Sequence, residues 1–220
     1  MDIVSLKKGE VVSLSKGQVV SLTKENPGLD KVIVGLGWDP VDKGVTQPAK
    51  GFFGRLFGGG SSESHSESDI DCDAFAVALE NGKLYRDRVL YFGEKSILSG
   101  ALVHSGDNLT GEGEGDDEQL IVNLKSVPSN IDTIIVAVNI YRGRSRGQRF
   151  GNIKNAYIRL VDCKDNSEMC RYDLSNTSEY ADYVTVHFGD LVRGSTGWEF
   201  KAVGAPSSAD SIGEFSNKYM

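Results

Sequence analysis

Residues 132–140 read Asp-Thr-Ile-Ile-Val-Ala-Val-Asn-Ile, and this run of β-branched and apolar residues is typical of a strand buried in a sheet. Similar runs recur on both sides of it, with Gly, Asn, Asp and Ser between them. They occupy residues 31–38, 74–79, 88–92, 120–124, 156–162, 183–191 and 197–203. None shows helical periodicity over three turns. Short strands at such spacing predict an all-β fold, either a sandwich or a barrel.

The chain begins with three copies of an eight-residue repeat, at residues 3–10, 11–18 and 19–26. Each copy contains Val-Ser-Leu and closes on Lys-Gly or Glu-Asn, which predicts a short strand followed by a turn. Three short copies are too few for a solenoid. We therefore expect them to form the opening strands of a sheet.

Two segments lack the strand pattern. Residues 41–68 end in a Gly, Ser and Glu-rich stretch that is too polar to order itself, so we expect a flexible insertion. The alternative is a docking or membrane-touching peg built on its apolar residues: Phe52, Phe53, Leu56 and Phe57. The small and polar residues 205–220 predict a frayed C-terminal tail. The expected organisation is one domain over residues 1–204 with an insertion at 41–68.

The acidic residues are concentrated in two places. Residues 106–118 contribute −6 and residues 61–73 contribute −5 to a net charge of −7, which leaves +4 for the rest of the chain. Such local patches indicate sites rather than an acidic solubilising surface, and they disfavour nucleic-acid binding, which needs a broad basic face. The chain has neither a transmembrane run nor a secretory signal pattern. Three cysteines, an odd number, indicate reduced thiols and a cytoplasmic protein.

The larger patch reads Gly-Asp-Asn-Leu-Thr-Gly-Glu-Gly-Glu-Gly-Asp-Asp-Glu, and no Lys or Arg occurs between Lys95 and Lys125. Carboxylates this dense repel one another unless water or a cation separates them. Ca²⁺ takes about 6–8 oxygen ligands, and the interspersed glycines allow the backbone to fold around it. The segment therefore favours calcium binding over the alternative, a solvated acidic loop.

The smaller patch contains Asp69-Ile-Asp-Cys-Asp73, directly before a strand pattern. Alternation places its three Asp side chains on one face of an extended segment, where they favour a cation. The spacing matches the start of an EF-hand loop, but Ala74 stands where that loop needs Gly, so we exclude an EF-hand. A charged strand end is the alternative for this cluster taken alone.

Three further groups have two interpretations each. Cys163 and Cys170 flank a predicted turn, and we interpret them as free thiols rather than as a disulfide or metal pair. We interpret His104 as packing beside a strand rather than as a general base or transition-metal ligand. The basic run 142–149 is more typical of a solvated connection than of a site for phosphate or an acidic partner. Since no nucleophile motif or phosphate loop is present, we expect no enzyme activity.

Taken together, these segments resemble the TerD family of tellurium-resistance and stress proteins. The resemblance rests on VSLSKG…VGLGWD, DIDCDAF, GDNLTGEGEGDDE and FGNIKNAYIRLVD…RYDLS…GWEFKAVG, and it covers residues 11–40 and 69–204. It implies a β-sandwich of two sheets with acidic loops at one end that bind two or more Ca²⁺ ions. It also implies a role in resistance to tellurite, chemical stress or phage. Other stress or tellurium-resistance proteins are then the expected partners, with peripheral contact to the inner membrane.

The resemblance also implies a set of calcium ligands: Asp69, Asp71, Asp107, Asn108, Glu112, Asp116, Asp117 and Glu118. Asp73 stands where the family more often has a small polar residue, so it is left out. If these carboxylates repel one another without calcium, Asp116→Asn or Asp117→Asn should be neutral or mildly stabilising in the calcium-free protein. The alternative function is that of a Ca²⁺-dependent carbohydrate-binding or hydrolytic β-sandwich.

Overall fold

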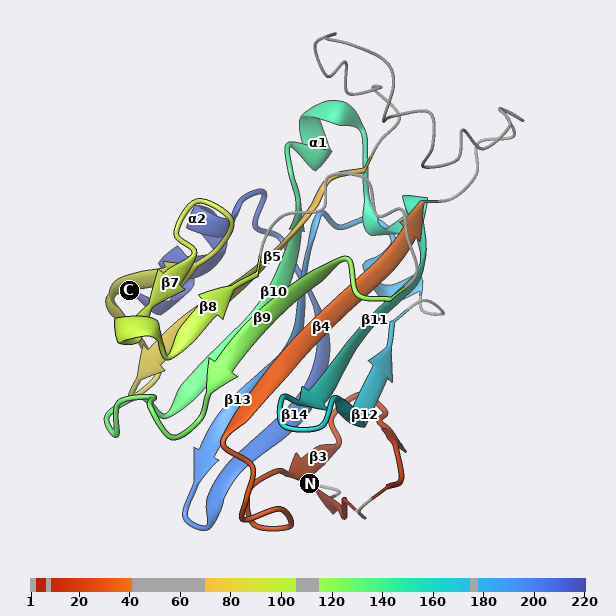
Figure 1. Cartoon of the computed structure of the whole chain (residues 1–220). Coiled ribbons are helices and arrows are strands. Elements are labelled where there is room, and N and C mark those ends of the chain that lie inside the picture. Colours follow the sequence, from red (N-terminus) through yellow and green to blue (C-terminus); the bar gives the residue numbers. More distant parts are fainter. Residues whose placement is uncertain (1–2, 7–8, 41–69, 106–114, 175–177) are drawn as a thin grey trace, which may run out of the picture.

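The computed structural model describes residues 3–6, 9–40, 70–105, 115–174 and 178–220, which form two seven-stranded sheets packed face to face (Figure 1). The first sheet has the order β1 (Ile3–Val4), β3 (Val19–Ser21), β14 (Gly197–Ser207), β13 (Thr185–Gly194), β10 (Thr133–Ile140), β5 (Cys72–Glu80), β6 (Lys83–Leu90). The second has the order β2 (Val12–Ser13), β12 (Ser167–Asp173), β11 (Ile153–Asp162), β4 (Lys31–Pro40), β9 (Glu118–Asn123), β8 (Leu102–His104), β7 (Ser96–Ile97). The predicted all-β sandwich is confirmed.

The main core lies between the sheets and follows the two-residue periodicity of the strands. On β4, Val32, Val34 and Leu36 are fully buried, while Gly35 and Gly37 face the other side of the sheet. Dispersion contacts and burial of this apolar surface hold the two layers together. Among the described residues, no helix is long and apolar enough to cross a membrane.

The N-terminal repeats alternate between the two sheets instead of opening one of them, as the sequence led us to expect. β1 pairs in parallel with β3, whereas β2 joins the other sheet beside β12. The physical reason lies in the turns after the first two copies. Gly9 and Gly17 have φ of +83° and +84°, a conformation that glycine adopts without steric cost and that turns the chain away from the sheet it has just left. Leu14 and Leu22 are buried in the core.

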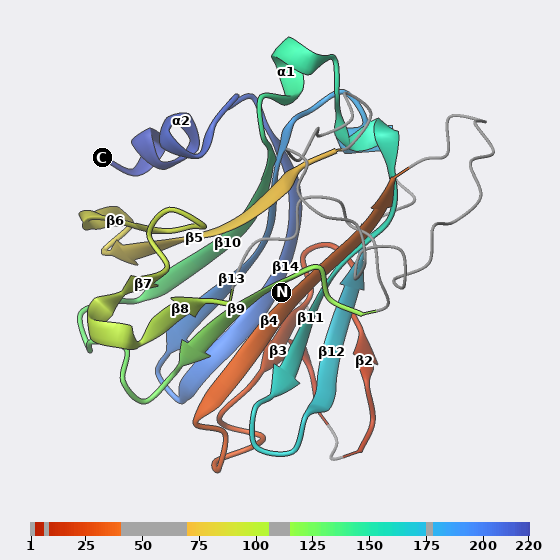
Figure 2. The same cartoon turned by 45° about the horizontal axis from the view of Figure 1, so that its top comes forward.

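The segment 205–220, for which the sequence predicts a frayed tail, is instead ordered against the outer face of the first sheet. It contains the end of β14 and helix α2 (Ile212–Ser216), which is followed by a 3-10 turn (Asn217–Tyr219) (Figure 2). Phe215 packs edge-on against Phe75 of β5, with ring centroids 5.2 Å apart. This contact closes a second apolar cluster outside the sandwich, which is why the tail docks.

One end of the sandwich gathers the segments that matter for function. The end of β4, the start of β5 and the short helix α1 (Gly143–Arg146) lie together at the top of Figure 1. β9 begins beside the end of β4, since the backbone N–H of Asp117 donates to the carbonyl of Leu36 at 2.8 Å. Both acidic segments therefore adjoin the same end.

Candidate functional site

The two sheets are joined at this end by buried polar side chains that bind the backbone of β5. The pairing of β6 with β5 ends at Ala76, so β6 does not reach the peptide groups of Ala74. The Ala74 N–H donates to Glu118 Oε2, and the Ala74 carbonyl lies 3.2 Å from His104 Nε2. A carbonyl only accepts, so His104 carries its hydrogen on Nε2. The side chains of His104 and Glu118 are fully buried.

His104 is therefore a structural residue. Its ring satisfies a backbone acceptor and lies 3.8 Å from Glu118 Oε2. The interpretation that His104 packs against a strand is confirmed. Because its Nε2–H is engaged with Ala74, the structure does not favour His104 as a general base.

The two acidic segments converge around Cys72, the first residue of β5. Burial is the largest cause that raises the pKa of the Cys72 thiol well above its ordinary value. The remaining causes are four carboxylates, which act in this order: Glu118, Asp71, Asp73 and Asp117. Carboxylates from both segments therefore act on this thiol, and Glu118 from the second segment reaches the backbone of Ala74 directly after the first.

Backbone hydrogen bonds hold this group of carboxylates in place. Asp117 Oδ2 accepts from the Trp38 N–H at the end of β4, at 2.8 Å. The Asp71 carbonyl accepts from the Tyr141 N–H, also at 2.8 Å, which ties the first acidic segment to the end of β10. Asp73, which was not among the predicted ligands, is buried, and its charge also raises the pKa of Cys72. We call Asp71, Asp73, Asp117 and Glu118 the acidic cluster.

Asp116 is not part of the acidic cluster. Its side chain is 1% exposed and lies on the outer face of the second sheet. Oδ1 accepts from Arg159 Nε at 2.7 Å and from the Tyr157 hydroxyl at 3.1 Å. Oδ2 accepts from Arg159 Nη2 at 3.1 Å and from Gln119 Nε2 at 3.0 Å. These bonds fill the roughly four lone-pair positions of a carboxylate. Asp116 is thus an anchor for the acidic segment, with both carboxylate oxygens engaged by protein donors.

The glycines of Val34-Gly-Leu-Gly-Trp38 make room for this anchor. A Cβ at Gly35 would lie 2.2 Å from Asp116 Oδ2, and one at Gly37 would lie 2.4 Å from the ring of Tyr157. Hydrogen bonding to Asp116 is the largest cause that raises the pKa of Arg159. Sequence reasoning missed Arg159 and Tyr157. The paired glycines inside a strand, which indicate close approach by another group, were the available signal.

The remaining predicted ligands lie outside the described residues: Asp69, Asp107, Asn108 and Glu112. Within the described ranges, no three His, Cys, Asp or Glu side chains are arranged to hold a metal ion by themselves. The described part of the site is therefore an acidic frame, built by β5 and β9, to which the segments 41–69 and 106–114 connect.

The hairpin of β11 and β12 shows how Cys163 and Cys170 lie relative to each other. Cys170 lies opposite Leu160 rather than opposite Cys163, and both thiols are free, as interpreted from the sequence. Burial raises the pKa of Cys170 to about 12, so its thiol is unreactive.

Comparison with known proteins places this geometry in a family. The TerD domain profile matches residues 11–219. The chain is 42% identical to stress response protein SCP2 of Bacillus subtilis and 40% identical to tellurium resistance protein TerX of Serratia marcescens, covering 99% of each chain in both cases. The crystal structure of a homologue of telluride resistance protein TerD from Streptomyces coelicolor has the same fold, with a TM-score of 0.59 at 19% identity. That match covers 84% of this chain and 94% of the other. The chain therefore belongs to the TerD domain family of tellurium-resistance and stress-response proteins.

Proposed function

We propose that this protein is a non-catalytic calcium-binding protein of the tellurium-resistance and stress-response type. The observation that carries the proposal is that the two acidic segments meet, since Glu118 Oε2 accepts from the N–H of Ala74, the residue that follows Asp71-Cys-Asp73. Oxygen donors in such number suit a hard divalent cation, and a bound Ca²⁺ would supply positive charge where the carboxylates repel one another.

The proposed ligand set differs from the one implied by the sequence. Asp116 leaves it, because its oxygens are occupied by Arg159 and its neighbours. Asp73 joins Asp71, Asp117 and Glu118. Four ligands are still proposed from the sequence alone: Asp69, Asp107, Asn108 and Glu112.

We further propose that the protein acts as an interaction module in the cytoplasm, with other stress or tellurium-resistance proteins as partners or in peripheral contact with the inner membrane. The names of its relatives support a role among such proteins, since proteins named for stress response and tellurium resistance match over nearly their full length. The role of the acidic end would be to present a surface whose charge depends on calcium.

Thermal unfolding in EDTA, Mg²⁺ and Ca²⁺ tests calcium binding. A ligand that binds only the folded state stabilises it by about 2.7 kcal/mol at roughly a hundredfold excess over Kd. For a chain of this size that corresponds to roughly 5–10 °C in Tm. Mg²⁺ should shift Tm less, because it demands a tight octahedron and releases water reluctantly. Identical melting curves in all three conditions would favour the alternative that the acidic segments are solvated loops without a bound ion.

Two variants distinguish calcium binding at the acidic cluster from a general effect of negative charge. Asp117→Asn should remove most of the calcium-dependent shift. Asp30→Asn changes an exposed acid at the opposite end of β4, paired with Lys125, and should leave that shift intact. An equal loss in both variants would indicate nonspecific charge screening instead of a site. Equilibrium dialysis with radioactive calcium then counts the ions, for which two or more are expected.

A further inference from the structure

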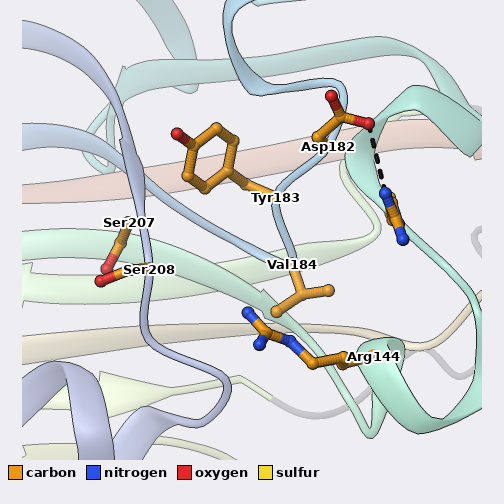
Figure 3. A pocket seen from close by; sticks show the side chains of 7 residues that line it. Arg144, Asp182, Tyr183, Val184, Ser207 and Ser208 are labelled. Carbon is orange, nitrogen blue, oxygen red and sulfur yellow. Dashed lines mark hydrogen bonds and ion pairs between the residues drawn. The ribbon is translucent and has the colours of Figure 1, made fainter.

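A hollow of about 320 Å³ opens beside α1 at the same end of the sandwich. Figure 3 shows its walls: Arg144 reaches in from α1, Tyr183 and Val184 come from the segment before β13, and Ser207 and Ser208 lie at the end of β14. Arg149 and Asp182 complete the lining. The volume is at the lower end of the range for small-molecule pockets.

The arginine loop that borders this hollow is solvent-exposed, as the sequence indicated, but its backbone is closely packed. α1 is a single turn between two left-handed residues, Arg142 (φ +52°) and Gly147 (φ +65°). Gly143 packs so closely that a Cβ there would lie 2.9 Å from Val184. The N–H of Phe150 donates to the Tyr183 carbonyl at 3.0 Å. The packing therefore fixes the backbone from which Arg144 and Arg149 project.

Within the described part of the chain, the charged side chains at the hollow form two solvent-accessible ion pairs. Arg144 Nη2 lies 2.8 Å from Asp210 Oδ1, and Arg149 Nη1 lies 3.3 Å from Asp182 Oδ1. The side chain of Asp182 is 86% exposed. Exposed pairs of this kind contribute about 0–1 kcal/mol, so a better anion can displace the carboxylates.

We propose that this hollow binds a small phosphomonoester. Two guanidinium groups from one rigid loop can each donate paired N–H bonds to phosphate oxygens, and phosphate carries more charge than the carboxylates it would replace. The Ser208 hydroxyl is exposed at the rim and adds a donor. Val184 forms an apolar floor, and the exposed ring of Tyr183 offers a face for the organic part of the ligand.

Calorimetric titration of the full chain with phenyl phosphate and with inorganic phosphate tests the proposal. Both should bind, and phenyl phosphate should bind more tightly because its ring reaches Tyr183. Arg144→Gln and Arg149→Gln should each weaken binding by about tenfold or more. Asp182→Asn removes a competing carboxylate and should strengthen binding. Sedimentation with vesicles containing phosphatidate distinguishes a lipid headgroup from a free phosphate as the source of this chemistry.

Arg142→Gln is the matched control, since Arg142 belongs to the same loop, stacks over Tyr141 and does not line the hollow. It should leave phosphate binding unchanged. An equal loss in Arg142→Gln would mean a diffuse basic surface and would overturn the pocket. The proposal would also be overturned if the wild-type protein bound neither compound at millimolar concentration. A preference for RNA that does not depend on Arg144 would overturn it as well.

Discussion

At the scale of single residues, Asp116 shows that an acidic residue in a sequence typical of calcium binding can have a structural role instead. Its carboxylate is buried and accepts four hydrogen bonds, two of them from Arg159. Repulsion between neighbouring acids is therefore not the dominant effect at this position. The charge of Arg159 and the hydrogen bonds outweigh it, because they act at closer range in a region shielded from water.

We predict that Asp116→Asn destabilises the calcium-free protein by about 1–3 kcal/mol, because the variant breaks a charge-assisted pair and leaves Arg159 partly buried without its carboxylate. This reverses the expectation from the sequence. Urea unfolding in EDTA measures it. Asp182→Asn, whose pair with Arg149 is exposed, should change stability by less than about 1 kcal/mol. Equal stability of wild type and Asp116→Asn would refute the anchoring role.

A second residue-scale prediction concerns Gly35. Gly35→Ala should destabilise the fold by about 1–3 kcal/mol, since the added Cβ would meet the Asp116 carboxylate at 2.2 Å in a packed region. Gly28→Ala is the control, because the nearest atom to its added Cβ is 3.9 Å away and its φ is not positive. Denaturation midpoints compare the two. A cost at Gly28 as large as that at Gly35 would show that the crowding around Asp116 is not the cause.

The residue scale also shows what the sequence could reveal about the site. The acidic composition of two segments was visible, and the structure brings residues 71–73 and 117–118 together. The sequence did not separate Asp116 from Asp117, because adjacent residues of identical type just before β9 differ only in the direction of their side chains. Arg159 lies 43 residues away from Asp116, so its partnership depends on the pairing of β4 with β9 and β11.

At the scale of elements, strands were found from their apolar runs, while the C-terminal helix was missed. Residues 205–220 are small and polar, and burial of Phe215 depends on a surface that only the assembled sheet creates. A signal did exist in β5. Residues 74–79 are apolar at every position, so both faces of that strand need cover, and one face is outside the sandwich.

We predict that Phe215→Ala destabilises the protein by about 3–5 kcal/mol, because it opens a cavity against Phe75 in the outer cluster. Met220→Ala at the same terminus should have almost no effect, since Met220 is 72% exposed. Hydrogen exchange of β5 amides reports the same difference locally. If both variants unfold like wild type, the tail is not part of the folded unit.

At the scale of the whole molecule, both proposed sites lie at one end of the sandwich and are linked through β10. The Tyr141 N–H binds the Asp71 carbonyl of the acidic cluster, and the arginine loop begins at the next residue. The opposite end holds turns and the N-terminal repeats. The two-sheet architecture was predictable, because alternating strands without helical periodicity leave few other ways to bury their apolar faces.

The segment between β4 and β5 gives the last prediction. Both strands have their full set of neighbours without it, since β4 lies between β11 and β9 and β5 lies between β10 and β6. Replacing residues 41–68 by a short Gly-Ser linker should therefore leave a cooperatively folding protein. Loop-closure cost changes by only about 0.6 kcal/mol for each doubling of length. Thermal melting followed by circular dichroism, with and without Ca²⁺, measures the cooperativity of unfolding. The variant keeps Asp69, so the calcium-dependent shift in Tm should survive. Loss of a cooperative transition would show that the segment is part of the folded domain, whereas loss of the calcium shift alone would place ligands within it.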